Sequence, residues 1–247
     1  MLHEPIQQQL LRLGLRGAAD TLTRLPLAAE VVDALALLLE AECLHRDTLA
    51  QARRLKLAKL GQHAHPADVD LRTARGLGKT RWQQLLGLNW LKRHQHLLLL
   101  GPTGIGKSYL ACALAKAAID HKHSVRYLRL PRLGEELALL QAQGRISHWL
   151  KTLARIDVLI LEDLGLVPLS PGQQPLLLEL LEDRHQRGSV IVTSQLPLKL
   201  WHGQFNDPTL ADAILDRLVH NAEIIELTGE SMRKHHPAGG DKPDLGD

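Results

Sequence analysis

The stretch from Gly101 to Ser108 constrains the fold of this 247-residue chain more than any other part of the sequence. It reads Gly-Pro-Thr-Gly-Ile-Gly-Lys-Ser and fits the phosphate-binding template G-x-x-x-x-G-K-[ST]. An apolar run, 97–100, precedes it, and a helix-favouring run, 109–119, follows it. A strand that turns sharply into a helix directs several backbone N–H groups toward one point, at the positive end of the helix dipole.

These residue types suit a nucleoside triphosphate. The glycines permit backbone angles and close approaches that a Cβ forbids. Lys107 can reach the terminal phosphates, and the Ser108 hydroxyl can bind Mg²⁺. A chance glycine-rich turn is the alternative, and the flanking strand and helix argue against it. We therefore predict a site for ATP and Mg²⁺ with these cofactor-binding residues: Gly101, Pro102, Thr103, Gly104, Ile105, Gly106, Lys107, Ser108 and Tyr109.

The rest of the second half alternates between strand and helix patterns. Apolar or alternating segments of strand length occur at 124–130, 156–161, 189–194 and 223–227. Helical patterns occur between them at 131–153, with an interruption at Gly144, and at 175–187 and 211–220. With 45% hydrophobic but only 3% aromatic residues, the core must consist mainly of aliphatic side chains. This pattern predicts an α/β fold with a parallel sheet between helical layers.

The first part of the chain is helical and basic. Residues 1–96 contain 14 Lys and Arg against 9 Asp and Glu. One helix is predicted over 1–25, with weak points at Gly14 and Gly17, and a second over 28–60. On the second helix, basic side chains share about one half of the surface, which makes them candidates for DNA phosphate contacts. They are Arg46, Arg53, Arg54 and Lys56, and a solvated helix face is the alternative.

A linker-like composition at 61–70 divides the chain. We expect a helical N-terminal module at 1–70, an ATPase core at 71–234 and a disordered tail at 235–247. Trp82, which lies among basic residues, is expected to pack on the core, although a nucleic-acid contact is an alternative. No apolar run approaches 18 residues, and the two cysteines, Cys43 and Cys112, are isolated. We therefore expect a cytoplasmic protein that does not contact a membrane.

Polar residues follow two of the predicted strands. Glu162 and Asp163 end the apolar segment 156–161; one carboxylate can hold Mg²⁺ and the other can orient or deprotonate the attacking water. By position, Glu162 is expected to serve the metal with Ser108, and Asp163 the water. Ser194 and Gln195 end the next strand, at the edge where ligands of open α/β sheets bind. Turn formation before Pro197 explains them equally well.

Five segments together resemble the IstB-like ATPases, helper proteins of insertion-sequence transposition that are related to DnaC-type helicase loaders in the AAA+ class. They are 101–108, 159–165, 192–197, 207–218 and 229–234. The front of the chain, at 38–46 and 54–60, is also similar to the N-terminal module of that family. The resemblance extends over nearly all residues from Leu10 to Lys234, and the segment 207–218 is its most specific part.

The resemblance implies a P-loop AAA+ core that assembles with ATP on duplex DNA, largely without sequence preference, as a ring or filament. It also implies recruitment or stimulation of a cognate transposase. Gln195, with Ser194 beside it, matches a sensor position, and Arg233 a second phosphate-sensing arginine. Arg217 matches an arginine finger that acts on a neighbouring subunit. From spacing alone, an ion pair of Arg217 with Asp212 or Asp216 would be the default.

One departure from the family pattern concerns the metal position. Related sequences have Asp where Glu162 stands, and the additional methylene displaces the carboxylate by about 1 Å, a scale to which catalysis is sensitive. We therefore expect ATP binding with slow hydrolysis. The alternatives for function are a DnaC-like helicase loader and a non-hydrolysing, ATP-gated DNA-binding scaffold.

Overall fold

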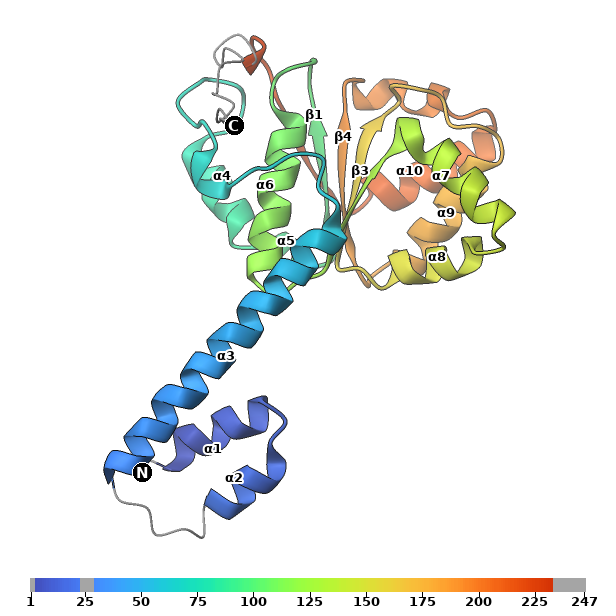
Figure 1. Ribbon diagram of the computed structural model, residues 1–247. Coiled ribbons are helices and arrows are strands. Elements are labelled where there is room, and N and C mark those ends of the chain that lie inside the picture. Colours follow the sequence, from blue (N-terminus) through green and yellow to red (C-terminus); the bar gives the residue numbers. More distant parts are fainter. Residues whose placement is uncertain (1–2, 23–28, 233–247) are drawn as a thin grey trace, which may run out of the picture. The chain divides into compact units, whose positions relative to one another are not determined.

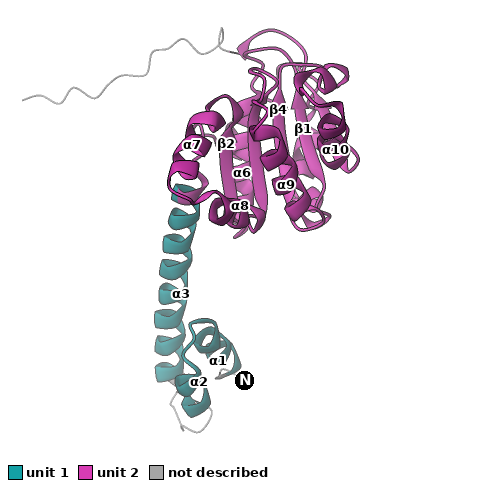
Figure 2. Ribbon diagram, turned by 90° about the vertical axis from the view of Figure 1, so that its right-hand side faces the viewer, with its two compact units in different colours: residues 1–56 teal, residues 57–247 magenta. Residues whose placement is uncertain are grey.

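A computed structural model describes residues 3–22 and 29–232 of the chain, and the predicted tail 235–247 lies outside them. Contacts divide the chain into two compact units, Met1–Lys56 and Leu57–Asp247 (Figure 2). This division falls earlier than the boundary expected near residue 70, because Ala58 and Val69 are buried in the core of the second unit. Within the two described ranges, no helix combines the length and apolar character needed to cross a membrane.

The described part of the first unit contains three helices. They are α1 (His3–Arg12), α2 (Arg16–Leu22) and most of α3 (Ala29–Ala58). The single helix predicted over 1–25 is wrong, because the chain turns at Gly14, which has a φ of +76°. Buried apolar residues of all three helices form a small core, with Ile6 and Ala19 almost fully enclosed. An Arg12–Asp47 ion pair and a 3.2 Å bond from Arg46 Nη1 to the Leu13 carbonyl link α3 to the end of α1.

The second unit is built on a five-stranded parallel sheet, which confirms the predicted α/β class. The strands are β1 (His96–Leu100), β2 (Val125–Arg129), β3 (Val158–Leu164), β4 (Ser189–Ser194) and β5 (Ala222–Glu226). Their order across the sheet is β2-β3-β4-β1-β5. β1 therefore lies between β4 and β5, the two strands that come last in the sequence. Because all neighbours are parallel, the carboxyl ends of all strands lie at one edge.

Helices cover both faces of this sheet, so the unit has three layers (Figure 1). The helices are α4 (Lys79–Leu86), α5 (Asn89–Lys92), α6 (Lys107–Asp120), α7 (Leu130–Ala142), α8 (Ile146–Ala154), α9 (Gln173–Arg184) and α10 (Pro208–Val219). Leu97 and Leu99 of β1 belong to the core cluster that contains α4–α6, whereas Leu98 and Leu100 belong to the cluster that contains α7–α10. Successive strand residues point to opposite faces, and this alternation separates the two clusters.

Two further expectations are settled by the packing. Trp82 is only 1% exposed and lies in the core cluster on the α6 side, which confirms that it packs on this unit. The interruption expected at Gly144 is confirmed, since Gly144 has a φ of +64° between α7 and α8.

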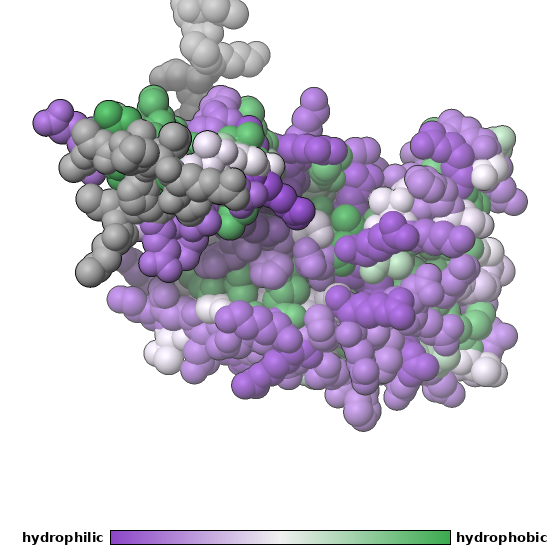
Figure 3. Space-filling view, turned by 90° about the horizontal axis from the view of Figure 1, so that it is seen from below, coloured by the Kyte–Doolittle hydropathy of each residue, from purple (hydrophilic) through white to green (hydrophobic). Residues whose placement is uncertain are grey.

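On the face drawn in Figure 3, hydrophilic residues predominate and hydrophobic ones show between them.

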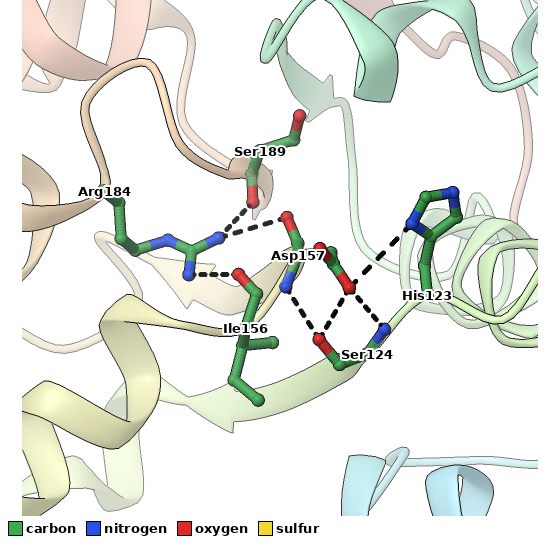
Figure 4. Close-up of polar contacts among 6 residues, drawn as sticks. All are labelled: His123, Ser124, Ile156, Asp157, Arg184 and Ser189. Carbon is green, nitrogen blue, oxygen red and sulfur yellow. Dashed lines mark hydrogen bonds and ion pairs between the residues drawn. The ribbon is translucent and has the colours of Figure 1, made fainter. Parts of the chain in front are cut away.

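A buried arginine supports the amino-terminal edge of the sheet (Figure 4). The Arg184 guanidinium, 1% exposed, donates to the carbonyls of Ile156 (2.6 Å), Ser189 (2.8 Å) and Asp157 (3.3 Å), and also to that of Leu153 (2.6 Å). Burial lowers the pKa of Arg184 to about 10, and the charge of Asp157 opposes this shift. The starts of β3 and β4 are thereby held together, at the edge opposite the phosphate loop.

Candidate nucleotide-binding site

The segment 101–108 connects the carboxyl end of β1 to the amino end of α6, as the template predicts. Gly101, Gly104 and Gly106 have φ values of +147°, +82° and +96°. A Cβ on Gly101 would lie 2.3 Å from the Leu227 carbonyl oxygen, and one on Gly104 would lie 2.2 Å from Ser231 Oγ. The positive φ favours glycine at all three positions, and at Gly101 and Gly104 the chain after β5 also leaves no room for a Cβ.

Lys107 is the first residue of α6, and its ammonium lies over the loop. Its Nζ donates to the carbonyl oxygens of Gly101 (2.7 Å) and Pro102 (2.9 Å). Burial lowers the pKa of Lys107, and the nearby carboxylates of Asp163 and Glu162 oppose this shift. Tyr109, which was predicted to bind the cofactor, is half-buried and packs against the core cluster.

Glu162 and Ser108 are in direct contact at the end of β3. The Ser108 hydroxyl donates to Glu162 Oε1, whereas Glu162 Oε2 is buried and has no hydrogen-bond partner among the residues that the structure describes. Burial raises the pKa of Glu162, and the hydrogen bond from Ser108 opposes this shift. An oxygen that is buried without a partner, beside a hydroxyl and a phosphate-type loop, fits a divalent cation.

The described residues, 3–22 and 29–232, contain no group of three or more His, Cys, Asp or Glu side chains that could hold a metal ion alone. Mg²⁺ in nucleotide sites takes only one or two carboxylates and completes its shell with phosphates and water. Ser108 and Glu162 are therefore the residues that would hold it.

Asp163 has an unusual backbone and an unexpected partner. Its φ is +61°, and its N–H donates to Thr193 Oγ1 at 3.0 Å where the β3–β4 register shifts. Such irregularities redirect side chains near functional sites. The Asp163 carboxylate accepts from Arg129 Nη2 (3.2 Å) and Nε (3.3 Å). Arg129 and Thr193 were not predicted; the available signal was their position at the ends of strands that neighbour β3.

Ser194 and Gln195 have different partners, although the sequence treated them together. The Ser194 hydroxyl donates to the Leu164 carbonyl at 2.7 Å and accepts the Leu196 N–H at 3.1 Å, which is the turn chemistry considered as an alternative. Gln195 Oε1 instead accepts a 2.5 Å bond from the Thr103 hydroxyl of the phosphate loop. Of the two, Gln195 is the one in contact with the predicted site.

The two candidate arginines are placed differently. Arg217 lies on α10 and donates to Asp216 at 2.9 Å, with Glu182 of α9 at 4.0 Å. Within one chain, therefore, Arg217 forms the ion pair that spacing alone would favour. Asp212, the other acid considered, lies 3.3 Å from His202 instead. Arg233 lies outside the described residues.

The basic residues predicted to contact DNA are not equally available. Arg53 and Lys56 are exposed on α3, and Arg54 is half-buried. Arg46 donates to Glu42 at 2.6 Å and to the Leu13 carbonyl, so its guanidinium already has two partners. The exposed cationic side chains of this helix that were predicted to contact DNA are therefore Arg53 and Lys56.

Comparison with known proteins identifies the family. The family described as IstB-like ATP binding protein matches residues 9–239. The chain belongs to this family. An insertion sequence ATP-binding protein of Sinorhizobium fredii, y4pL, is 45% identical over 240 residues, which are 95% of this chain and 98% of the relative. The ATP-binding protein of insertion sequence IS21 from Pseudomonas aeruginosa is 34% identical over 199 residues, 81% of this chain and 75% of the relative.

Solved structures support the fold. A structure of DnaI matches with a TM-score of 0.57 and 22% identity, over 68% of this chain and 90% of that chain. The DnaC helicase loader matches with a TM-score of 0.56 and 20% identity, over 67% of this chain and 97% of that chain. This IstB-like protein therefore has the AAA+ P-loop fold and is a member of an ATP-binding family.

Proposed function

We propose that this IstB-like protein is an ATP-dependent, DNA-binding helper of a cognate transposase, which assembles on duplex DNA and hydrolyses ATP to regulate transposition. One observation carries the proposal: Lys107, Ser108, Glu162 and Gln195 meet around a glycine loop at the carboxyl edge of the sheet. The names of the relatives, which are insertion sequence ATP-binding proteins, support the biological setting. The site of action would then be the cytoplasm, where the DNA is.

Each side chain has a distinct task in this proposal. The loop N–H groups and the Lys107 ammonium bind the phosphates, and Ser108 with Glu162 holds Mg²⁺, which neutralises phosphate charge. Asp163 orients the attacking water or accepts its proton, and Gln195 senses the γ-phosphate through its bond with Thr103. The Arg129 guanidinium occupies Asp163 Oδ2, so this ion pair must open before that oxygen can accept a bond from the water. Slow basal turnover is the expected consequence.

Arg217 is proposed to complete the site of a neighbouring subunit. Within its own chain its contacts are with Asp216 and Glu182, on the helices α10 and α9. An arginine supplied by a neighbour can stabilise the charge of the transferring phosphoryl group by a factor of about 10³–10⁵ in rate. Hydrolysis would therefore depend on assembly as a ring or filament. Arg233 is proposed to contact phosphate as well, on the resemblance alone.

The decisive experiment measures ATP turnover and particle size together, with and without duplex DNA. We expect ATP and DNA to drive assembly and to raise turnover in the wild type. Lys107→Ala should abolish ATP binding, whereas Arg217→Ala should abolish turnover and leave ATP binding intact. Arg81→Ala is the matched control, because Arg81 has a similar exposure and a comparable ion pair, with Glu223 at 3.1 Å.

The outcomes separate the alternatives. A protein that remains monomeric, with turnover unchanged by Arg217→Ala, would refute the shared-site mechanism. Tight ATP binding without phosphate release, even with DNA, would favour a non-hydrolysing scaffold. The DnaC-like fold keeps a helicase loader as the second candidate, and co-purification with a replicative helicase in place of a transposase would favour it.

The DNA surface is proposed to include α3 of the N-terminal module. Replacing Arg53, Arg54 and Lys56 by Glu should weaken duplex binding at low salt, because phosphate contacts by Arg and Lys provide sequence-independent affinity. The control variant places three Glu at the exposed positions Arg132, Arg145 and Lys151, with the same change in net charge. Equal losses in both variants would indicate a net-charge effect and refute a specific role of α3.

A further inference from the structure

A second buried arginine of this unit, Arg75, lies directly behind the phosphate loop. Arg75 precedes α4, is 3% exposed and donates through Nη1 to the Ile105 carbonyl at 3.1 Å. Its Nη2 donates to the Asp70 carbonyl at 2.8 Å. A Cβ on Gly106 would lie 2.6 Å from Arg75 Nη1, so the guanidinium rests against the residue before Lys107.

The charge of Arg75 is only partly compensated. The ion pairs of residues 3–22 and 29–232 include none to Arg75. Asp70, the acid whose charge acts on Arg75, uses its carboxylate to accept from the Thr73 hydroxyl at 2.6 Å and the Arg72 N–H at 2.8 Å. Burial lowers the pKa of Arg75, and the attraction of Asp70 opposes this shift, but a guanidinium keeps its proton in proteins. A buried cation of this kind is costly unless another negative group approaches.

The bond to Ile105 acts on the part of the loop that would face phosphate. The Ile105 carbonyl and the Gly106 N–H belong to the same peptide unit. A charged donor on the carbonyl polarises that unit and strengthens its N–H as a donor. Arg75 is itself held in place, because its own carbonyl accepts the Thr228 N–H at 3.0 Å.

We propose that Arg75 is a positioning residue for the nucleotide phosphates, which holds the Ile105–Gly106 peptide in its binding orientation and supplies a buried positive charge behind the loop. The inference rests on the proposed nucleotide site and extends it to a residue outside the template. It predicts a dependence on ligand charge: the more negative nucleotide should benefit more from Arg75.

Arg184 provides a matched control. It is similarly buried and, within the part of the chain that the structure describes, it also donates only to backbone carbonyls, but it does so at the opposite edge of the sheet. If buried arginines act here only by supporting the fold, Arg75→Met and Arg184→Met should have similar effects. If Arg75 acts on phosphates, only Arg75→Met should change the relative affinities for ATP and ADP.

The test is calorimetric titration of the full chain with ATP and with ADP. EDTA removes divalent cations, so the nucleotide phosphates keep their full negative charge. The temperature is one at which circular dichroism shows that the variants are folded. Arg75→Met should weaken ATP binding by about tenfold, equivalent to about 1.4 kcal/mol, and ADP binding by less. Arg75→Lys keeps the positive charge but loses the two-pronged guanidinium that bonds to two carbonyls. This variant should bind ATP more tightly than Arg75→Met and less tightly than wild type. Arg184→Met should lower the melting temperature and leave the ATP-to-ADP affinity ratio unchanged.

Three results would overturn the inference. The first is an ATP affinity of Arg75→Met within twofold of wild type. The second is an equal loss of ATP affinity and ADP affinity in Arg75→Met. The third is the same change of the ATP-to-ADP affinity ratio in Arg184→Met as in Arg75→Met. If Arg75→Met does not fold, the affinities of Arg75→Lys are the test. Wild-type affinity of Arg75→Lys for both nucleotides would then refute the role of the guanidinium group. Lys107→Ala separates this failure from failure of the site itself, since ATP binding unchanged by Lys107→Ala would refute the nucleotide site.

Discussion

His96, the first residue of β1, should make the protein sensitive to acid. The side chain is 8% exposed, and its Nδ1 accepts the Val190 N–H at 3.1 Å, which requires the neutral imidazole. Burial lowers the pKa of His96 to about 4 from 6.5, and the charges of Arg184 and His185 add to this shift, while a backbone hydrogen bond with Arg217 opposes it. A protonated His96 would leave the Val190 N–H without its acceptor.

The sign and size follow from the two pKa values. Because the folded-state pKa lies below the unfolded value, protonation favours unfolding, so the stabilisation is complete above pH 6.5 and declines as the pH falls toward 4. Between pH 7.5 and pH 5 the wild type should lose about 2 kcal/mol of unfolding free energy through this group, at 1.36 kcal/mol per pKa unit. The total available to pH 4 and below is about 3.4 kcal/mol.

Urea unfolding at pH 7.5 and pH 5 measures this effect when wild type is compared with His96→Asn. The Asn side-chain oxygen can accept the Val190 N–H but does not titrate. Asn is smaller, so the variant should be less stable at pH 7.5, and its additional loss at pH 5 should be smaller than that of wild type by about 2 kcal/mol. Parallel losses in the two proteins would refute the assignment of the acid sensitivity to His96.

Three further predictions concern the site. Gly101→Ala should lower the unfolding free energy by about 2 kcal/mol or more in urea, because Gly101 has a positive φ and its Cβ would meet the Leu227 carbonyl. The control is Gly203→Ala, where a Cβ would enter open space and should change the unfolding free energy by less than about 0.5 kcal/mol. Glu162→Asp should raise the ATPase rate, since the Glu162 carboxylate touches the Ser108 hydroxyl and a shorter side chain leaves more room for a cation; an unchanged or lower rate contradicts this. Arg129→Gln should raise basal turnover by up to about fivefold, because a partly exposed ion pair contributes on the order of 1 kcal/mol. No increase in turnover would show that the pair does not restrain Asp163.

Sequence patterns predicted the sheet, its layers and the phosphate loop because each depends on local signals. Apolar runs of strand length fix the strands, and the template fixes the turn into α6. The first helix was predicted to be too long. Helical periodicity in the sequence continues across Gly14, but the φ of +76° at Gly14 ends the helix. The boundary near residue 70 was placed by composition, whereas the structure buries Val69 in the core of the second unit.

Contacts between distant segments were not predictable in the same way. Arg129 and Asp163 meet because β2 and β3 are neighbours, with Arg129 opposite Glu162, and no spacing in the sequence specifies that register. Arg75 reads as one more basic residue before α4, and only the fold shows that it bonds to Ile105, thirty positions later. Ser194 and Gln195 were indistinguishable until the turn at Pro197 gave their side chains different partners.

The position of β1 has a consequence for how the protein is made. β1 pairs on one side with β4 and on the other with β5, and the loop that follows β1 packs against Leu227 and Ser231. During synthesis, the strand that leads into the phosphate loop therefore remains without either neighbour until about two hundred residues have emerged. Pairings so distant in sequence form late and slowly. ATP binding should accordingly appear only after β5 has been synthesised. A nascent or truncated chain lacking β5 should expose an apolar strand edge and require a chaperone to remain unaggregated.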